Sequence, residues 1–95
     1  MTQEQLIKEF IAGANEGNND GKHNLIIKNG QLIHYYTLIA ERAGGKFIVN
    51  MTRYSIVTGR IQKMLRENIP NDRLIIAFKV PEGTRKTLVP YIKIE

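Results

Sequence analysis

The sequence predicts a single α+β domain, in which two helices cover one face of a mostly antiparallel sheet of about five strands. Three observations lead to this fold class. The chain has 95 residues, which suits one domain and leaves little room for a second. Two segments repeat apolar residues at three- and four-residue intervals, as helices do. Several short runs of β-branched and aromatic residues are separated by turn residues, so the expected order is α-β-β-β-α-β-β.

The first expected helix covers residues 1–14. Thr2 and Gln5 form a capping-box pattern, in which each side chain bonds the backbone N–H of the other residue. One face of this helix is apolar and contains Leu6, Ile7, Phe10, Ile11 and Ala14. The glycine- and asparagine-rich segment 15–22 is expected to be a flexible linker, because nothing in it gains from burial. The remaining residues, 23–95, are expected to hold the sheet and the second helix.

The dipeptide Asn29-Gly30 predicts a tight hairpin, because both residues tolerate the positive φ that a type I′ turn requires. Pairing outward from this turn sets the register of the two strands. The expected pairs are Lys28 with Gln31, Ile27 with Leu32, Ile26 with Ile33, and Leu25 with His34. A second turn, at Gly44-Gly45, joins residues 37–42 to residues 46–50 in another hairpin. The result is an antiparallel meander of three strands.

The stretch RYSIVTGRIQKMLRE predicts the second helix. Ser55 is the expected N-cap residue, with Thr58 as the alternative if the helix begins late, and Pro70 ends the helix. The expected buried stripe contains Ile56, Ile61, Met64, Leu65 and Ile69. Gly59 costs about 1 kcal/mol relative to alanine if it lies inside the helix. Either the helix begins at Thr58, or another group approaches the backbone closely at Gly59.

Two further strands are expected in the segments NDRLIIAFKV and TLVPYIKIE, joined by the turn PEGTRK. Because both helices are expected on one face of the sheet, the other face must be polar or must meet a partner. An unpaired edge strand also allows two copies of the chain to form a homodimer.

The chain offers few groups for catalysis or metal binding. Its two histidines, His23 and His34, are expected on the same face of the first hairpin, with no carboxylate or third histidine beside them. We therefore interpret them as polar residues at the water-exposed edge of a strand pair. Ser55 is the only serine, its capping role accounts for it, and cysteine is absent. We expect a protein that is not an enzyme and binds no metal or other cofactor.

The sequence shows no pattern of membrane insertion or secretion. Its longest unbroken apolar runs are a few residues, whereas a membrane-spanning helix needs about 20. The N-terminal segment MTQEQLIKEF is polar and does not have the pattern of a secretory signal. We expect no membrane contact and a cytoplasmic location.

The net charge of +5 is unevenly distributed along the chain. Residues 1–20 carry one lysine and four acidic residues, whereas residues 21–95 carry thirteen basic and five acidic residues. A basic surface attracts polyanions such as nucleic acid. The residues expected to contact phosphates lie on the second helix and at the tip of the last hairpin: Arg53, Arg60, Lys63, Arg66, Arg85 and Lys86. The alternative is that these residues only keep the surface solvated.

Two classes of partner stay open. In the first, the chain contacts nucleic acid through its basic residues, and tyrosines on the open sheet face stack on bases. The four tyrosines are Tyr35, Tyr36, Tyr54 and Tyr91, which alternatively fill the margin of the core. In the second, the chain is a protein–protein inhibitor or adaptor, whose open sheet face and acidic N-terminal helix contact a host protein complex.

The stretch YYTLIAERAGGKFIVNMTRYSIVTGRIQKMLRE resembles a family of small phage and mobile-element proteins whose function is not established. In that family a strand pair leads into a helix that begins with tyrosine-serine and hydroxyl residues and continues with basic-x-glutamine. The matching positions are Thr37, Ile39, Ala40, Asn50, Tyr54, Ser55, Thr58, Arg60, Ile61, Gln62 and Leu65. Val57 and Gly59 depart from the family pattern, which usually has threonine and serine there. The resemblance implies a phage-type binding or inhibitory protein, for example one that blocks a host defence complex.

Overall fold

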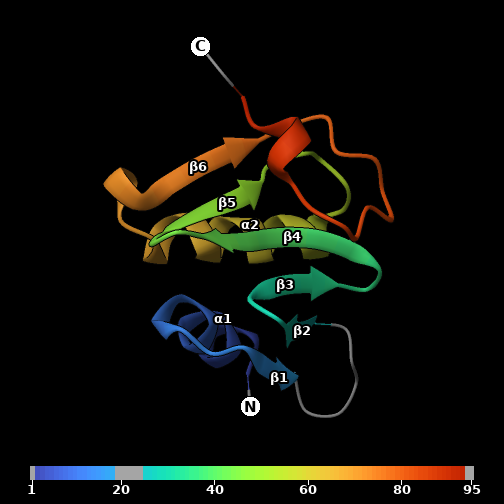
Figure 1. Cartoon of the computed structure of the whole chain (residues 1–95). Coiled ribbons are helices and arrows are strands. Elements are labelled where there is room, and N and C mark those ends of the chain that lie inside the picture. The colour runs from blue at the N-terminus through green and yellow to red at the C-terminus, as the bar shows by residue number, and fades with distance from the viewer. Residues whose placement is uncertain (1, 19–24, 94–95) are drawn as a thin grey trace.

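The computed structural model describes residues 2–18 and 25–93, and over these residues the chain forms one α+β domain (Figure 1). The described helices and strands are α1 (Gln3–Ala12), β1 (Glu16–Asn18), β2 (Leu25–Lys28), β3 (Gln31–His34), β4 (Thr37–Ala43), β5 (Lys46–Asn50), α2 (Ile56–Asn68) and β6 (Leu74–Ala77). Two short 3-10 helices, η1 (Asn71–Arg73) and η2 (Val89–Tyr91), precede and follow β6. The spatial order of the described strands follows the chain, β1-β2-β3-β4-β5-β6. The predicted fold class and its mostly antiparallel sheet are confirmed.

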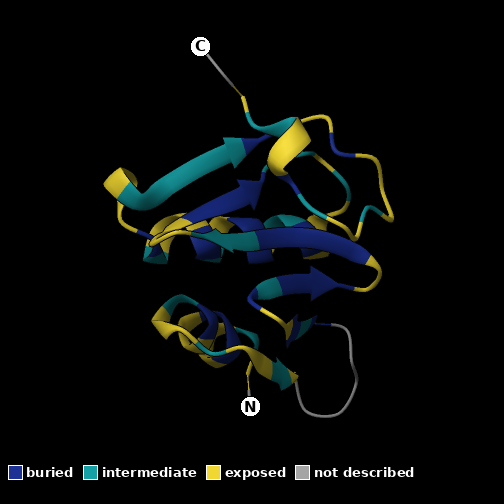
Figure 2. Cartoon of the chain, viewed as in Figure 1, coloured by how far each residue is buried: buried dark blue, intermediate teal, exposed yellow. Residues whose placement is uncertain are grey.

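Both helices lie on one face of the sheet, as predicted. Figure 1 shows α2 running behind β4 and β5, and Figure 2 shows how much of β3, β4 and β5 is buried. A buried cluster joins the helices to this face: Leu6, Ile7, Phe10, Leu25, Ile27, Leu32, Ile39, Ala40, Phe47, Val49, Ile61, Leu65 and Ile69. Because side chains alternate along a strand, the remaining apolar strand residues point to the opposite face.

The opposite face is not open, because residues 80–92 pack over it, and the expectation of an open sheet face is therefore wrong. A second buried cluster there joins these residues to the strands: Ile33, Leu38, Ile48, Ala77, Val80 and Leu88. Glu41 on β4 anchors the covering segment, since its Oε1 accepts hydrogen bonds from the Leu88 N–H and the Thr87 hydroxyl, both at 2.8 Å. The sheet thus has a helical layer on one face and an irregular layer on the other.

The segment that was expected to be a flexible linker contains a strand. Glu16–Asn18 forms β1, which pairs antiparallel with β2, with Gly17 opposite Ile27. A Cβ atom on Gly17 would lie 2.8 Å from Leu6 Cδ1, so the absence of a side chain lets β1 lie close beneath α1. This strand depends on a tertiary contact that no local pattern reveals. Residues 19–22 of the expected linker lie outside the described residues.

The register of the first predicted hairpin and the pairing of the second are confirmed. β2 and β3 pair across Asn29-Gly30 in the predicted order. Asn29 and Gly30 have φ values of 51° and 76°, as the tight turn between these strands requires. β4 and β5 pair on either side of Gly44 and Gly45, which also have positive φ.

The expected middle strand of the meander is two strands rather than one. β3 ends at His34 and β4 begins at Thr37, and Tyr35 and Tyr36 form a tight turn between them. Tyr35 adopts a φ of 56°, which is uncommon for a residue with a side chain. Because neither glycine nor asparagine marks this turn, the sequence pattern predicts an uninterrupted strand through it.

The second helix begins at Ile56, and Ser55 caps it, because the Ser55 hydroxyl oxygen accepts a hydrogen bond from the Thr58 N–H at 3.2 Å. Gly59 therefore lies inside α2. The prediction that Ile56 is buried is wrong, since its side chain is 79% exposed. Gln62 is buried instead, and its Nε2 donates hydrogen bonds to Asn50 O at the end of β5 and to Thr52 O just after it. The other members of the predicted stripe are buried or half-buried.

The last predicted hairpin is wrong. β6 ends at Ala77 and pairs parallel with β5, because the chain crosses over the sheet through α2 before it returns. The segment that was expected to pair with β6 forms η2, apart from an isolated antiparallel bridge between Ala77 and Ile92. Pro90 has no N–H for a strand ladder, and Leu88 is drawn into the second cluster.

The two edges of the described sheet are β1 and β6. The end of β6 is partly protected, because the Lys93 N–H donates to Ile76 O and the Phe78 N–H donates to Tyr91 O. β1 is three residues long and has a glycine at its centre. A homodimer that forms through a sheet edge, as the sequence allows, has β1 or the start of β6 as its contact strand.

Candidate functional site

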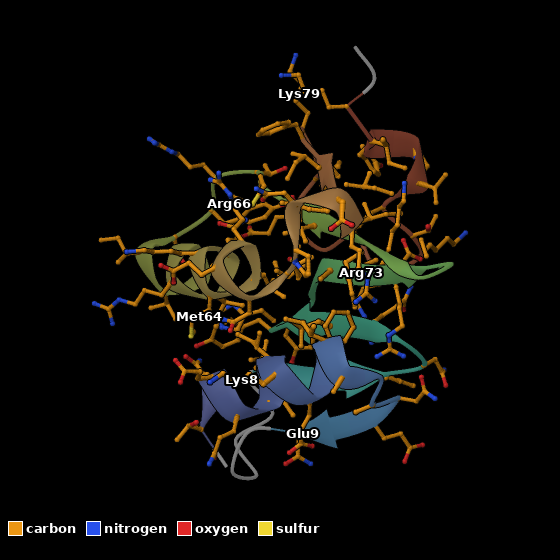
Figure 3. The ribbon with its side chains drawn as sticks, turned by 90° about the vertical axis from the view of Figure 1, so that its left-hand side faces the viewer. Lys8, Glu9, Met64, Arg66, Arg73 and Lys79 are labelled. Atoms are coloured by element: carbon orange, nitrogen blue, oxygen red, sulfur yellow. The ribbon has the colours of Figure 1, made fainter. Side chains whose placement is uncertain are left out.

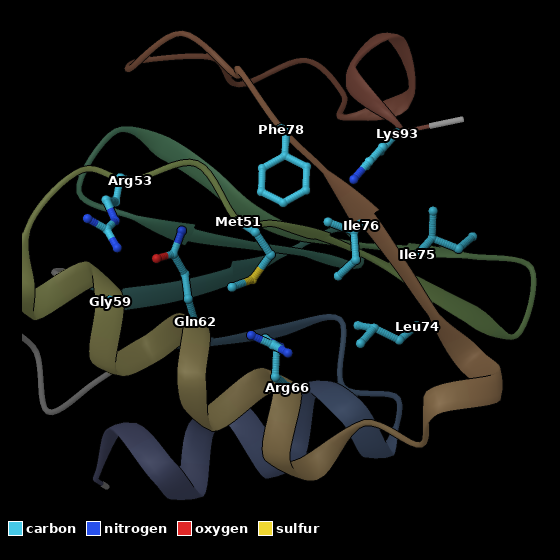
Figure 4. Close-up of a pocket in the computed structure, with 10 residues that line it drawn as sticks. All are labelled: Met51, Arg53, Gly59, Gln62, Arg66, Leu74, Ile75, Ile76, Phe78 and Lys93. Atoms are coloured by element: carbon cyan, nitrogen blue, oxygen red, sulfur yellow. The ribbon is translucent and has the colours of Figure 1, made fainter. Parts of the chain in front are cut away.

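A groove of about 860 Å³ lies between α2 and β6 (Figure 4). Its lining residues come from these two elements and from the segments that flank them: Met51, Arg53, Gly59, Gln62, Arg66, Leu74, Ile75, Ile76, Phe78 and Lys93. A neighbouring hollow of about 500 Å³ continues the groove along α2 and adds Lys63, Glu67 and Asn71.

The floor of the groove is apolar. Because side chains alternate along a strand, Leu74 and Ile76 of β6 and the following Phe78 share one face, and Leu74 packs against the cluster beneath the helices. Met51 directly follows β5 and lies between helix and strand, and Figure 4 shows Arg66 of α2 extending toward these side chains. The apolar side chains of Met51 and of β6 thus form the floor of the groove, and α2 borders it.

Three cations stand around this apolar floor, and none of the ten lining residues is acidic. Arg53 precedes α2, Arg66 lies on α2, and Lys93 belongs to the C-terminal segment. Lys93 Nζ lies 5.6 Å from the centroid of the Phe78 ring, in a cation–π contact. The Phe78 side chain is 41% exposed although it is large and apolar. The groove therefore combines positive potential with an exposed aromatic surface.

Gly59 lies on the groove side of α2, close to the start of the helix. A Cβ atom at this position would meet no atom of a neighbouring residue within 4 Å. The packing of the chain therefore does not require a glycine here, although glycine inside a helix is unfavourable. Because Gly59 has no side chain, the backbone of α2 is exposed to the groove at this turn.

The structure brings together three of the six predicted phosphate-binding residues. Arg53 and Arg66 line the groove, and Lys63 lines the hollow that continues it. Arg60 is exposed on the same helix but lines neither hollow. The helix pattern was sufficient to place Lys63 and Arg66 on this side of α2, whereas their role in binding stays a prediction.

The structure separates Arg85 and Lys86 from the groove. Both are exposed in the segment that covers the other face of the sheet, where Lys86 O accepts a hydrogen bond from Gln31 Nε2 at 2.9 Å. Phe78 and Lys93 line the groove instead, and neither was among the predicted site residues. They reach it through the parallel pairing of β6 and the return of the chain along β6. The unexplained helical Gly59 was the sequence signal that pointed to this surface.

Two other arginines are engaged within the chain. The Nε of Arg73 donates to Gly45 O at 2.6 Å, and its guanidinium lies 5.1 Å from the centroid of the Phe47 ring. Arg42 bonds the carbonyl oxygens at the end of α1. Figure 3 shows Arg73 lying against the sheet, whereas Lys79 extends away from it. These two arginines stabilise contacts between segments of the domain.

The stacking role of the tyrosines stays a prediction. Of the four, only Tyr91 shares a hollow with residues of the groove, one of about 490 Å³ that Phe78, Lys79 and Lys93 also line. The Tyr54 hydroxyl accepts a hydrogen bond from Asn50 Nδ2 and donates one to Val80 O, so its polar end is engaged inside the fold. Tyr35 and Tyr36 are exposed in the turn between β3 and β4. None of the four tyrosines lines the groove, where Phe78 supplies the aromatic ring.

His34 is buried, so the prediction of a water-exposed histidine is wrong for this residue, and His23 lies outside the described residues. The Nδ1 of His34 lies at hydrogen-bond distance, 3.0 Å, from Thr58 Oγ1. Its Nε2 is buried and has no hydrogen-bond partner among the described residues. Burial lowers the pKa of His34 below its ordinary value of 6.5, because it disfavours the charged ring.

A small cavity of about 90 Å³ adjoins His34 and the start of α2, and Glu82 also lines it. The Ser55 hydroxyl donates to Thr58 Oγ1 at 3.1 Å and accepts from the Thr58 N–H. Ser55 is therefore held by Thr58 as a helix cap, an arrangement that differs from a serine nucleophile activated directly by histidine.

Within residues 2–18 and 25–93, no group of three or more histidine, aspartate or glutamate side chains is placed to hold a metal ion. Across the same residues, neither helix is long and apolar enough to cross a membrane.

Comparison of the chain with known protein families, with curated proteins and with solved structures found no match.

Proposed function

We propose that this protein is a non-enzymatic nucleic-acid-binding protein whose binding surface is the groove between α2 and β6. The observation that carries the proposal is the gathering of Arg53, Arg66 and Lys93 around the groove without any acidic lining residue. Nucleic acid is the polyanion that such a surface attracts, because each phosphate contact releases condensed counterions.

The two arginines suit phosphate contact by their geometry as well as by their charge. A guanidinium presents its N–H groups in a planar fork that matches two oxygens of one phosphate. Arg53 and Arg66 are exposed, whereas Arg42 and Arg73 are engaged with backbone oxygens. Lys63 lines the hollow that continues the groove, where Glu67 partly offsets its charge, and it can add a further phosphate contact.

The test is a fluorescence-polarisation titration of labelled oligonucleotides at about 50 and 200 mM salt. An Arg53→Glu/Arg66→Glu variant is compared with an Arg85→Glu/Lys86→Glu variant, which has the same change of net charge on the segment covering the other sheet face. We expect binding that weakens steeply with salt, and a loss of at least tenfold only in the first variant. Equal losses in both variants would assign the binding to overall charge, and absence of binding at the lower salt would remove the proposal.

A second candidate function is that of a protein–protein inhibitor or adaptor, such as a phage protein that blocks a host defence complex. The observation in its favour is an exposed apolar patch: Tyr35 is 54%, Tyr36 74%, Ile56 79% and Val57 47% exposed. The contact between His34 and Thr58 joins the two segments that carry these residues. Exposed apolar patches of this kind mark protein interaction sites.

The second function is tested by capture from a nuclease-treated host lysate. A bound protein that survives nuclease and is lost from a Tyr36→Ser/Ile56→Ser variant, but not from a Val89→Ser control, supports it. Val89 is also exposed, at 57%, and lies in η2. A bound protein that disappears after nuclease treatment contradicts it, because nucleic acid then bridges the two proteins.

A further inference from the structure

We infer that the nucleic acid held in the groove is single-stranded, with one unpaired base lying over the apolar floor against Phe78. This inference rests on the proposed function and names the form of its ligand. It follows from three features of the groove: its apolar floor, the positions of its cations together with its volume, and the helix turn at Gly59, which has no side chain.

The floor distinguishes single strands from duplexes. In a duplex the base faces are stacked inside, and the outer surface offers phosphates, sugars and base edges. The phosphates of a duplex can hydrogen-bond Arg53 and Arg66. A duplex offers no apolar surface to cover the side chains of Met51, Ile76 and Phe78, which stay exposed to water. An unpaired base has an apolar face that stacks on an aromatic ring, whatever the base. A floor of this composition therefore suits a base that is free of its complement.

The position of the cations matches a single nucleotide. Lys93 Nζ lies over one face of the Phe78 ring, 5.6 Å from its centroid, and Arg66 extends from the helix side of the groove (Figure 4). A base that stacks on Phe78 therefore lies near both cations, which can contact its flanking phosphates. The groove volume of about 860 Å³ is within the range of sites that enclose one small organic molecule.

Gly59 supplies the third feature. A Cβ atom there would point into space that no neighbouring residue occupies, and Gly59 lines both the groove and its continuation. A ligand backbone that passes along α2 can approach the helix closely at this turn only because the side chain is missing. The glycine, which the fold itself does not require, is thereby explained by the ligand.

The first experiment compares three probes of equal length by fluorescence polarisation: a 12-residue oligothymidylate, the same strand paired with oligoadenylate, and an abasic strand with the same phosphates. Stacking of a base on an aromatic side chain strengthens binding by about tenfold. We expect the single strand to bind at least tenfold more tightly than the abasic strand, and more tightly than the duplex.

The second experiment uses variants of the groove. Phe78→Ala is expected to weaken binding of the single strand about tenfold and to leave the abasic strand unaffected, whereas Tyr36→Ala, a control at an exposed aromatic outside the groove, retains full affinity. Gly59→Ala is expected to weaken binding several-fold while the melting temperature rises. The rise excludes misfolding as the cause of the loss.

The outcomes separate this inference from the proposed function. If no probe binds at about 50 mM salt, the proposed function fails and the inference fails with it. If all three probes bind equally and Phe78→Ala has no effect, the inference is overturned, while a loss in Arg53→Glu/Arg66→Glu still supports phosphate binding in the groove. Competition by polyglutamate as effective as that by oligothymidylate also overturns the inference, because the groove then accepts any polyanion.

Discussion

The guanidinium of Arg42 on β4 holds the C-terminal end of α1, where its Nη2 donates to Phe10 O at 2.7 Å and to Ala14 O at 2.6 Å. Its Nη1 donates to Gly13 O at 3.3 Å and to Asn15 Oδ1 at 2.9 Å, and the group lies 5.1 Å from the centroid of the Phe10 ring. The last turn of α1 contains no basic residue of its own. A residue of the sheet thus supplies the cation that the negative end of the helix dipole favours.

Replacing Arg42 by methionine is therefore expected to lower the free energy of unfolding by about 2 to 3 kcal/mol, because several helix-end carbonyls lose a charged donor. Urea denaturation measures the change. Arg85→Met removes the same charge from an exposed loop and is expected to stay within about 0.5 kcal/mol of the wild type. Similar values for the two variants would show that Arg42 contributes only charge.

Gly59→Ala is expected to raise the free energy of unfolding by about 0.5 to 1 kcal/mol, because alanine is the better helix former and its Cβ meets no neighbour. Thermal unfolding followed by circular dichroism measures the change. Gly83→Ala is the matched control, since its Cβ also meets no atom, but its φ of +90° strains alanine. We expect Gly83→Ala to destabilise, and a loss of stability in Gly59→Ala would contradict the helical position of Gly59.

Gly17→Ala is expected to destabilise the fold by about 1 to 3 kcal/mol, because the added Cβ would lie 2.8 Å from the fully buried Leu6 side chain. Urea denaturation of Gly17→Ala and of a Gly17→Ala/Leu6→Val double variant measures the effect and its relief. If the close contact is the cause, the shorter valine recovers part of the loss that alanine introduces. Additive losses in the double variant would refute this explanation.

Stability is expected to fall as the pH is lowered below about 6.5, because burial lowers the pKa of His34 in the folded state. Between the two pKa values the unfolded chain binds a proton on His34 that the folded chain does not bind. The stability that comes from keeping His34 neutral is therefore fully present above pH 6.5 and is lost as the pH falls toward the folded-state pKa. The slope for one proton is at most about 1.4 kcal/mol per pH unit.

Urea denaturation between pH 7.5 and pH 5 measures this dependence in the wild type and two variants. His34→Gln keeps a polar group near Thr58 and is expected to flatten the slope, whereas His23→Gln is expected to retain it. If the slope persists in His34→Gln, other groups titrate and His34 does not account for the pH dependence.

Local chemistry was sufficient to predict the parts of the fold that depend on a few adjacent residues. Asn29-Gly30 fixed a hairpin register, and Thr2 and Ser55 marked helix starts, because the turn and cap geometries restrict which residues fit. The turn at Tyr35-Tyr36 has no such residues and was missed. β1 was missed because its pairing depends on the space that Gly17 leaves beneath α1.

Of the residues that line the candidate site, only those on or next to α2 could be predicted from the sequence. Lys63 and Arg66 lie on α2 and Arg53 shortly precedes it, so their proximity is local information. Phe78 and Lys93 join them through the parallel pairing of β5 with β6 and the isolated bridge at Ala77. Such pairings join segments that are distant in sequence, and hairpin rules favour adjacent antiparallel strands instead.

The crossover from β5 through α2 to β6 has a consequence for the energetics of binding. Both walls of the groove belong to one continuous segment, and β6 is hydrogen-bonded to β5 along its length. β6 cannot move away unless this ladder opens, and α2 is held to the sheet by the buried Ile61 and Leu65 and by the hydrogen bonds of Gln62. The groove is therefore preorganised before any ligand arrives. The loss of conformational entropy on binding then falls mainly on the flexible ligand strand, and a short oligonucleotide constrained in its bound shape will bind more tightly than an unconstrained one.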